Sequence, residues 1–365
     1  METLTDTSFV HRMQLPRPDV TQEDAEHILR KQYNLSGSLK ELGSQQDRNY
    51  RVDTGEARFV LKVCLVEYAL VELEAQNSAM KHLRNKPEAP RVPAIIPTVG
   101  GEEIIMLKVR GQEYRVRLLE YLEGEPLIEQ SHLPTTAVFA IGTLCAQLTL
   151  GLADFKHPGL ERSLQWDLRR AGPVTDHLLP AISNIEKRDH IATVMAATLK
   201  RIQPLEKELR IQPVHHDLTG DNLLVASEAG RAVPEAVIDF GDITQGWLVS
   251  DLAVTVAWLL QCVGDDVRSI LPAIKAYNTT CPLNDAELQA LWPLIVARAV
   301  VLVVSSEQQL AIDPSNDYVR RNAEYEGRIF DIATSVDPDL MDAEILAVVR
   351  DIVVERTIQT PTRAH

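Results

Sequence analysis

The sequence changes character about one third of the way along, and this change limits the folds that the chain can adopt. Up to residue 120, short strand-like runs and turn signals dominate, with helical segments between them. From residue 134 the pattern is mainly helical, and strand-like runs return only around residues 211–240. Segregated strands and helices indicate an α+β protein. We therefore expect a bilobal protein, with a small β-rich lobe at 1–120 and a larger, mainly helical lobe at 121–365.

Local signals in the first lobe predict a sheet flanked by helices. Thr21, followed by Asp24 three residues later, is typical of a capping box at the start of a helix. A meander of about three strands is expected to end at residues 59–63. Residues 66–84 have the apolar spacing of a helix, and residues 102–122 read as a second hairpin.

The charge balance argues against a nucleic-acid partner. The formal net charge is −15, and no basic stripe is present in the sequence. Binding to a phosphate backbone depends on clustered lysine and arginine that release counterions. An acidic chain instead suits a cationic small molecule, or a metal that screens an anionic one.

Cysteine usage and apolar runs indicate a cytoplasmic protein. The four cysteines lie far apart, which argues against a disulfide framework or a zinc site. The first ten residues, METLTDTSFV, carry no basic-then-apolar targeting signal. The longest apolar stretch, around residues 252–260, is too short to cross a bilayer. We therefore expect no membrane partner.

The segment VHHDLTGDNLLV, residues 214–225, sets polar groups inside an apolar, strand-like frame. Asp217 and Asn222 are five residues apart, and Asp239 follows the apolar run AVI. Phosphoryl transfer uses one carboxylate to orient the attacking hydroxyl, and an amide and a second carboxylate to hold Mg²⁺. The alternative is that these residues only form a turn and end a strand. Finding both elements in this order and spacing favours the catalytic interpretation.

Two neighbouring histidines in this segment suggest zinc at first sight. Adjacent residues on an extended chain point to opposite faces, so His215 and His216 do not reach one metal easily. We interpret His215 as a histidine that braces the loop. Asp251 opens a later apolar run and is either a helix N-cap or an anchor for the same loop.

A phosphate-binding lysine is expected upstream of this loop. Lys62 lies in the strand-like run FVLKV, where the alternative is an edge lysine that faces solvent. A kinase site pairs such a lysine with a glutamate of the next helix. Glu74 lies on the stripe that leads to Met80, whereas Glu72 points away from it, so Glu74 is the predicted partner. The alternative is that both glutamates are solvated.

Two connecting segments are candidates for binding the nucleotide. The turn LGSQQDRNYRV contains a single glycine, but main-chain N–H groups around Ser44, Gln45 and Asp47 can cradle a phosphate. The segment LLEYLEGEPL joins the two lobes. We expect adenine to bind there through main-chain groups near Glu120 and Leu122.

Three further residues are candidates for acceptor recognition. Asp242 lies just beyond the Phe-Gly pair that follows Asp239, and it is a second acid near the metal or the substrate. Trp166 and Asp167 offer an aromatic face and a carboxylate to a cationic acceptor. The alternative for these last two residues is helix packing and a cap.

Taken in order, Lys62, Glu74, HHDLTGDN, VIDFGD and SDLAV resemble the aminoglycoside phosphotransferase and choline kinase superfamily, which has a protein-kinase-like fold. The runs ELEAQNSAMKHL, VIDFGDITQGWLVSDLAV, LQWDL and LAIDPSNDYV are most similar to hydroxylysine kinase and to the kinase domains fused to class III aminotransferases. The resemblance covers roughly residues 20–335. The chain departs from it at His216, where glycine is common, and in the glycine-poor phosphate loop.

The resemblance implies a role for each matching residue. Asp217 is expected to be the catalytic base, Asn222 and Asp239 the Mg²⁺ ligands, and Lys62 with Glu74 the phosphate-positioning ion pair. The predicted reaction moves the γ-phosphate of ATP or GTP to a hydroxyl of an amino alcohol, a hydroxy amino acid such as hydroxylysine, or an aminoglycoside.

Two other hypotheses stay open at this point. One is a protein Ser/Thr kinase of the same fold, and the other is a non-catalytic nucleotide-binding module. The sequence does not choose between ATP and GTP, name the acceptor or set the oligomeric state.

Overall fold

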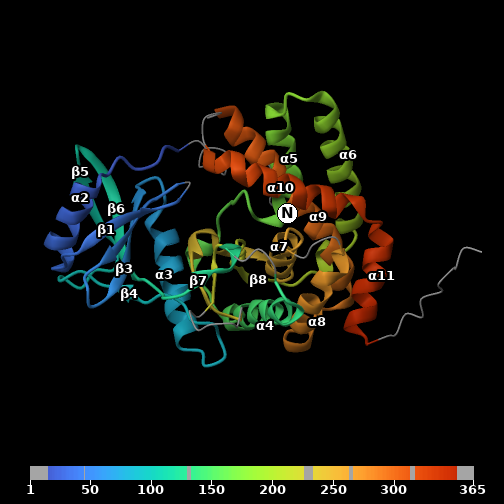
Figure 1. Cartoon of the computed structure of the whole chain (residues 1–365), viewed down its shortest axis with the longest axis horizontal. Helices are drawn as coiled ribbons and strands as arrows, with labels where there is room; N and C mark the ends of the chain where they lie inside the picture. The colour runs from blue at the N-terminus through green and yellow to red at the C-terminus, as the bar shows by residue number, and fades with distance from the viewer. Residues whose placement is uncertain are drawn as a thin grey trace, which may run out of the picture.

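A computed structural model of the chain describes residues 15–44, 46–129, 133–225, 233–262, 266–312 and 317–351. A strand-rich lobe at the N-terminal side lies beside a larger helical lobe (Figure 1). The predicted α+β bilobal fold is therefore confirmed. The exact domain boundary at residue 120 stays a prediction, although the last long strand of the first lobe ends there.

One antiparallel sheet forms the body of the first lobe, in the order β1-β2-β3-β6-β4 with β5 also paired to β6. Its strands are β1 (Ser38–Leu42), β2 (Arg48–Asp53), β3 (Arg58–Leu65), β4 (Ile95–Ile96), β5 (Ile105–Val109) and β6 (Gln112–Glu120). The expected meander and second hairpin are thus both present. Strand β3 is central, and its register places Lys62 opposite Asn49 of β2 and Arg117 of β6. Lys62 is buried, so it is not a solvent-facing edge residue.

Helix α2 (Gln22–Ile28) lies against this sheet and begins at the predicted capping box. The Thr21 side chain accepts a hydrogen bond from the Asp24 N–H, and the Asp24 carboxylate accepts one from the Thr21 N–H. Together these bonds satisfy two N–H groups that a helix start leaves open. Buried apolar residues of the helix and the sheet share one core.

Helix α3 (Leu70–Arg84) packs between the two lobes. Leu73 packs into the core of the sheet, whereas Ala79, Met80 and Leu83 pack into the core of the helical lobe. Leu70 itself is exposed, so the buried stripe begins one turn later than the apolar spacing suggested. This shift decides which polar residues of the helix face the space between the lobes.

Small sheets frame the junction after β6. Strand β7 (Glu125–Pro126) pairs with β9 (Leu223–Val225), which pairs with β10 (Pro234–Val237). A second ladder joins β8 (Ile211–Val214) to β11 (Thr244–Trp247). Both ladders are antiparallel. Together they bring the loop after β8 and the loop after β10 close to each other.

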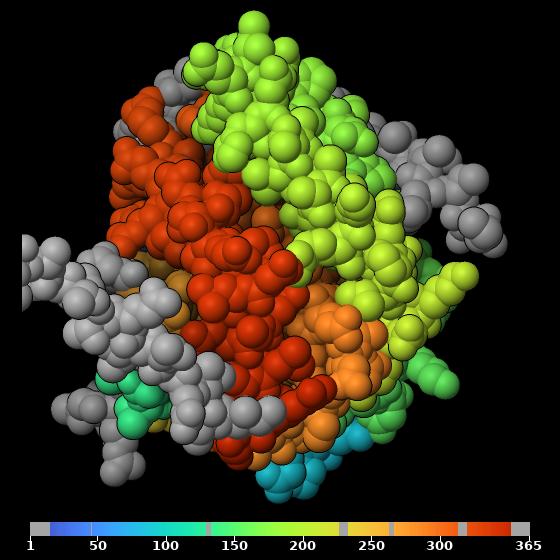
Figure 2. Space-filling model, turned by 90° about the vertical axis from the view of Figure 1, so that its right-hand side faces the viewer, coloured from blue at the N-terminus to red at the C-terminus, as the bar shows by residue number. Residues whose placement is uncertain are grey.

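Helices make up the rest of the second lobe. They are α4 (Thr135–Leu152), α5 (Ala171–Leu178), α6 (Ile185–Ile202), α7 (Ser250–Leu259), α8 (Leu271–Thr280), α9 (Asp285–Ile312), α10 (Asp317–Ser335) and α11 (Pro338–Val349). On one face of this lobe, α10 and α11 lie beside α6 and α8 (Figure 2). Arg201 of α6 pairs with Asp339 and Asp342 of α11, both at 2.8 Å, which ties this face together.

Two helices, α4 and α9, are long and apolar enough to span a bilayer by length and composition. The expectation that residues 252–260 form the longest apolar stretch is therefore wrong. In the fold these helices pack inside the second lobe, and 89% of the most apolar window of α9 is buried. Their composition follows from this burial, because a helix that is surrounded by others is apolar on all sides.

Candidate active site

A buried carboxylate shapes the loop between β8 and β9. Asp251, in the first turn of α7, is 2% exposed. Its two carboxylate oxygens accept the main-chain N–H groups of His215 at 3.0 Å and His216 at 2.9 Å. The side chain does not cap α7, so of its two possible roles Asp251 acts as the anchor.

The two histidines serve different structural roles. The His215 ring contacts the Ile238 carbonyl at 3.1 Å through Nε2, and its Nδ1 accepts the Asp217 N–H at 3.3 Å. It therefore links the loop to the turn after β10, which carries Asp239. His216 has a left-handed backbone (φ +66°), and its buried ring packs on Gly246, where a Cβ would clash. Burial lowers the pKa of His216 to about 3, which keeps the ring neutral.

Asp217 projects from this braced loop, with 37% of its side chain exposed. One carboxylate oxygen accepts the Asn222 amide N–H at 2.8 Å, and the other accepts Arg298 Nη2 at 3.3 Å. Burial raises the pKa of Asp217, and the Arg298 guanidinium opposes this shift. Two fixed donors orient the carboxylate, as a group that positions an attacking hydroxyl requires.

Asp239 faces this carboxylate from the turn after β10. It also has a left-handed backbone (φ +59°), an uncommon conformation outside glycine, and its side chain accepts the Gly241 N–H at 3.1 Å. Lys62 Nζ donates to the same oxygen at 3.1 Å, across the junction of the lobes. The Lys62 ammonium lowers the pKa of Asp239 to about 2. Asp239 is therefore a fixed anion, 46% exposed to the space between the lobes.

The donor set fits a hard divalent cation that shares its coordination with phosphate. The Asn222 amide group turns its NH₂ toward Asp217, so its carbonyl oxygen is the atom left for a cation. Asp239 supplies an ionised carboxylate. Across the described residues, no three His, Cys, Asp or Glu side chains gather as a metal site. A cation here would take most of its ligands from water and nucleotide. Mg²⁺ is usually coordinated in this way, whereas structural zinc is not.

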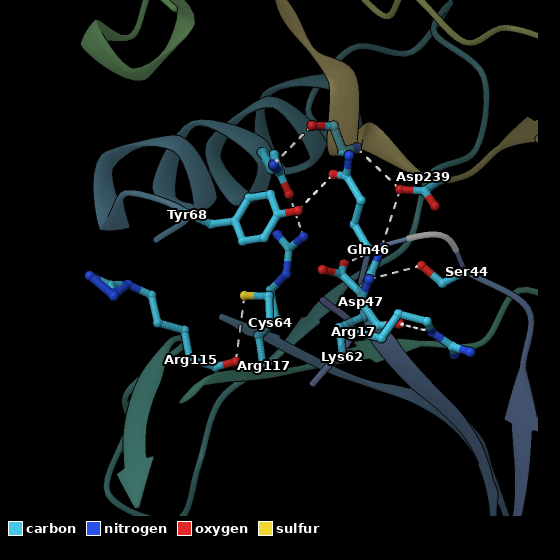
Figure 3. Close-up of polar contacts among 12 residues, drawn as sticks. Arg17, Ser44, Gln46, Asp47, Lys62, Cys64, Tyr68, Arg115, Arg117 and Asp239 are labelled. Atoms are coloured by element: carbon cyan, nitrogen blue, oxygen red, sulfur yellow. Dashed lines mark hydrogen bonds and ion pairs between the residues drawn. The ribbon is translucent and has the colours of Figure 1, made fainter. Parts of the chain in front are cut away.

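The predicted phosphate loop between β1 and β2 lies next to Lys62 (Figure 3). The Ser44 hydroxyl accepts the Asp47 N–H at 3.1 Å, and the Asp47 carboxylate lies 3.8 Å from Lys62 Nζ. Gln46 in turn accepts a hydrogen bond from the Tyr68 hydroxyl at 2.8 Å. Asp47 is thus a second anionic neighbour of Lys62, beside Asp239. A phosphate oxygen is suited to the position next to Lys62 that the Asp47 carboxylate occupies. Gln45, also predicted to bind nucleotide, lies outside the described residues.

The predicted ion pair between Lys62 and Glu74 is wrong. Glu74 is exposed, because the buried stripe of α3 begins at Leu73 and passes through Gln76. Gln76 instead donates to the Gly241 carbonyl at 3.2 Å and accepts from the buried Arg117. A neutral amide therefore takes the inward position on α3, and the anionic partners of Lys62 come from Asp47 and Asp239.

Glu72, which the sequence placed on the outer face of α3, has a structural role. Its carboxylate lies 3.5 Å from Arg162, a side chain only 8% exposed. Arg162 Nη2 also donates to the carbonyls of Gly241 at 2.6 Å and Ile243 at 3.1 Å. Arg162 and Gln76 therefore both hold the Gly241 carbonyl, and they fix the turn that carries Asp239 relative to α3.

The connector between the lobes has an apolar lining suited to a base. Leu122 packs with Leu224 and Ala236 in a small buried cluster. The Glu120 N–H donates to the Ala94 carbonyl at 2.8 Å, and the Tyr121 N–H is also engaged. The Glu120 carboxylate accepts the Ala94 N–H at 3.0 Å. Within the described ranges, Leu122 is the first connector residue whose N–H has no partner, so it is the better candidate for binding adenine.

The three residues proposed for acceptor recognition have different positions. Asp242 faces the site, and burial, with a smaller contribution from Asp217, raises its pKa to about 6. Asp167 is fully buried and pairs with Arg169 at 2.7 Å, so its predicted contact with the acceptor is wrong. It caps the short helix that follows, because its carboxylate accepts the Arg169 N–H. The Trp166 ring stacks under the Arg298 guanidinium at 4.6 Å, so a cation of the chain itself covers one face of the ring.

Arg298 is a site residue that the sequence reasoning missed. It lies in α9 and reaches Asp217 from the opposite side to Asn222. The sequence did carry a signal, since Arg298 is the one charged residue in the apolar run between Glu287 and Glu307. A buried charge within an apolar helix is retained for a partner or for function.

Two lobes joined by a connector, with a strand lysine facing an Asp-Asn-Asp set, define a kinase-like phosphotransferase. The phosphotransferase enzyme family model matches residues 38–282. The chain therefore belongs to this phosphotransferase enzyme family.

Similar proteins agree with this assignment. Hydroxylysine kinase of Mus musculus is 24% identical over 326 residues, which cover 82% of this chain and 85% of the mouse protein. Hydroxylysine kinase of Danio rerio is 24% identical over 315 residues, covering 82% and 87%.

Solved structures share the fold. A microcompartment-associated aminopropanol kinase superposes with a TM-score of 0.69 at 19% identity, covering 90% of this chain and 100% of that one. An amicoumacin kinase in complex with AMP-PNP gives a TM-score of 0.65 at 14% identity, covering 88% and 97%. These likenesses confirm the kinase-like fold.

Proposed function

We propose that this protein transfers the γ-phosphate of ATP or GTP to a hydroxyl group of a small acceptor, an amino alcohol or a hydroxy amino acid. One observation carries the proposal. The Asp217 carboxylate is held by Asn222 and Arg298, and it shares one space with the Lys62–Asp239 pair. The relatives named hydroxylysine kinase and aminopropanol kinase support an acceptor of this class.

Each residue of this set has a chemical role in the proposal. Asp217 orients the acceptor hydroxyl and accepts its proton as the oxygen forms a bond to the γ-phosphorus. The bond from that phosphorus to the β-phosphate oxygen breaks, and the nucleoside diphosphate leaves. Lys62 exchanges its contact with Asp47 for the phosphates. Phosphoryl transfer of this kind depends mainly on positioning and on charge stabilisation.

Mg²⁺ is the cation that the donor set fits, and Asn222 and Asp239 are the residues proposed to hold it. Bound there with a nucleotide, it would neutralise charge on the phosphate oxygens. The Asp239 carboxylate is already ionised and oriented by the chain itself, because Lys62 lowers its pKa and the Gly241 N–H binds one of its oxygens.

The net charge of −15 favours a cationic acceptor, which an acidic protein attracts over a distance. Asp242, whose pKa is raised by burial and by the nearby Asp217 carboxylate, forms no hydrogen bond or ion pair with another described residue, so it is a candidate to meet an acceptor ammonium group. We propose a cytoplasmic location for this reaction.

A panel of acceptors tests the proposal. Hydroxylysine, homoserine, ethanolamine, choline and kanamycin are each incubated with ATP or with GTP, and nucleoside diphosphate formation is measured against a reaction without acceptor. We expect acceptor-dependent turnover that stops when EDTA removes Mg²⁺, and a phosphorylated product by mass spectrometry. Turnover of a generic protein substrate such as casein, with none of the small acceptors, would show that the acceptor class is wrong.

A further inference from the structure

A buried arginine beside the proposed base has unused hydrogen-bonding capacity. Arg298 is 3% exposed, and Nη2 donates to Asp217 at 3.3 Å. Its Nε and Nη1 groups are buried and find no acceptor among the residues that the structure describes. The Trp166 ring lies against the guanidinium at 4.6 Å, which fixes the plane of the donors.

An arginine buried in this way requires an explanation. Unpaired donors on a buried charged group are costly, and native structures rarely leave them open. Burial lowers the pKa of Arg298, and the neighbouring carboxylates oppose this shift. A ligand that brings an oxyanion to Nε or Nη1 would supply the missing acceptor.

Carboxylates of the chain surround this arginine without pairing fully with it. Asp242 and Glu326 contribute to its electrostatic environment, but neither forms an ion pair with it within the described part of the chain. Glu326 lies in α10, and its Oε2 atom is buried without a hydrogen-bond partner. Arg298 thus has unsatisfied donors, and Glu326, which contributes to its electrostatic environment, has an unsatisfied acceptor, a combination complementary to a zwitterion.

We propose that Arg298 is the specificity residue that binds the carboxylate of the acceptor. The acceptor is then a hydroxy amino acid and not a simple amino alcohol, and its ammonium group faces Asp242 or Glu326. This inference rests on the proposed phosphotransferase function. Asp217 and the carboxylate would share one guanidinium, so the hydroxyl and carboxylate oxygens of the acceptor lie about 5–8 Å apart, given ordinary hydrogen-bond lengths.

Matched pairs of acceptors test the inference. Homoserine is compared with 3-aminopropan-1-ol, and 5-hydroxylysine with 1,5-diaminopentan-2-ol, so that each pair differs only in the carboxylate. For the wild-type protein we expect kcat/KM to be about 10- to 150-fold higher for at least one amino acid than for its decarboxylated partner, the range for a charged hydrogen bond. Equal values within both pairs, or a preference for the decarboxylated partners, would overturn the assignment.

Variants separate recognition by Arg298 from a merely structural role. In Arg298→Gln the preference for the carboxylate should fall to near unity, mainly through a higher KM of the amino acid. Arg298→Lys keeps a charge beside Asp217 and should recover part of the preference, which covers the case in which the glutamine variant does not fold. A loss of kcat/KM that is equal for both members of a pair would make Arg298 only a support for Asp217.

A control and a separate outcome complete the design. Arg201→Gln changes an arginine of α6 that pairs with Asp339 and Asp342 of α11, and it should leave the preference unchanged. If no acceptor of either pair is phosphorylated while the protein binds nucleotide, the proposed function itself fails. If both members of each pair are phosphorylated equally, only the role of Arg298 fails.

Discussion

Asp251→Asn is the substitution with the clearest structural consequence outside the reacting groups. Asp251 lies in the first turn of α7. It accepts the N–H groups of His215 and His216 at 3.0 and 2.9 Å from a site that is 2% exposed. Asparagine has the same shape but only one acceptor oxygen, so one buried N–H loses its partner and faces an NH₂ group.

The expected loss follows from these two bonds. A hydrogen bond to a charged group contributes about 1.5–3 kcal/mol, and an unpaired buried donor has a cost of similar size. We therefore expect Asp251→Asn to lower the free energy of unfolding by about 2 kcal/mol, and Asp251→Ala, which leaves both N–H groups unpaired, by about 4 kcal/mol. The loop that orients Asp217 would loosen as well, so kcat should fall at least about tenfold while nucleotide affinity changes little.

Urea unfolding followed by circular dichroism, with the slope compared between variants, measures the stability change. Asp285→Asn is a matched control, since Asp285 also lies in the first turn of a helix but is 78% exposed in its pair with Arg350. It should change stability by less than about 0.5 kcal/mol. An Asp251→Asn protein as stable as this control, with wild-type kcat, would refute the view that Asp251 holds the loop.

Three further predictions test the other corrections and buried groups. Glu74→Ala should leave nucleotide affinity and stability within about 0.5 kcal/mol of wild type. Gln76→Ala removes one acceptor of Arg117 and one of the two donors to the Gly241 carbonyl, so it should weaken nucleotide binding measured by calorimetry. Asp167→Asn should lower the free energy of unfolding by about 3 kcal/mol or more without changing the KM of the acceptor, because it removes the buried anion that pairs with the Arg169 guanidinium. His216→Gly should remove a pH dependence of stability, and glycine tolerates the left-handed backbone at this position. The pKa of His216 in the folded protein, about 3, lies below its value in the unfolded chain. The contribution of the neutral ring to stability is therefore fully present above about pH 6.5 and is lost as the pH falls toward about 3. Wild type should therefore lose about 2 kcal/mol more than the glycine variant between pH 7 and pH 5 in urea titrations; equal losses would contradict a neutral buried ring.

Local signals were sufficient to predict the fold. Turn residues, capping boxes and apolar spacing are encoded within a few residues of each other, and the strands, the Thr21 capping box and the helical second lobe follow from them. The set of Lys62, Asp217, Asn222 and Asp239 was also predictable, because chemistry fixes both the residue types and their order. The structure places Lys62 and Asp239 3.1 Å apart across 177 residues of chain.

The errors come from contacts that the spacing of residues along the chain does not determine. Glu74 and Gln76 lie on one helix, and which of them faces inward depends on how α3 docks between the two cores, which starts the buried stripe at Leu73 instead of Leu70. Asp167 looked available to a substrate because its partner depends on the fold of the next turn. Arg298 stands 81 residues from Asp217, so no motif spacing relates them.

The central claim is that Asp217 positions and deprotonates a small acceptor hydroxyl. The most direct test measures acceptor phosphorylation by the wild type and by Asp217→Asn with Mg²⁺ and nucleotide, and follows the phosphorylated product by ³¹P NMR. We predict that the asparagine variant still binds nucleotide and loses kcat by about 10²–10⁴-fold, as expected when a positioned general base is removed. An Asp217→Asn protein that phosphorylates the acceptor at the wild-type rate would contradict the account.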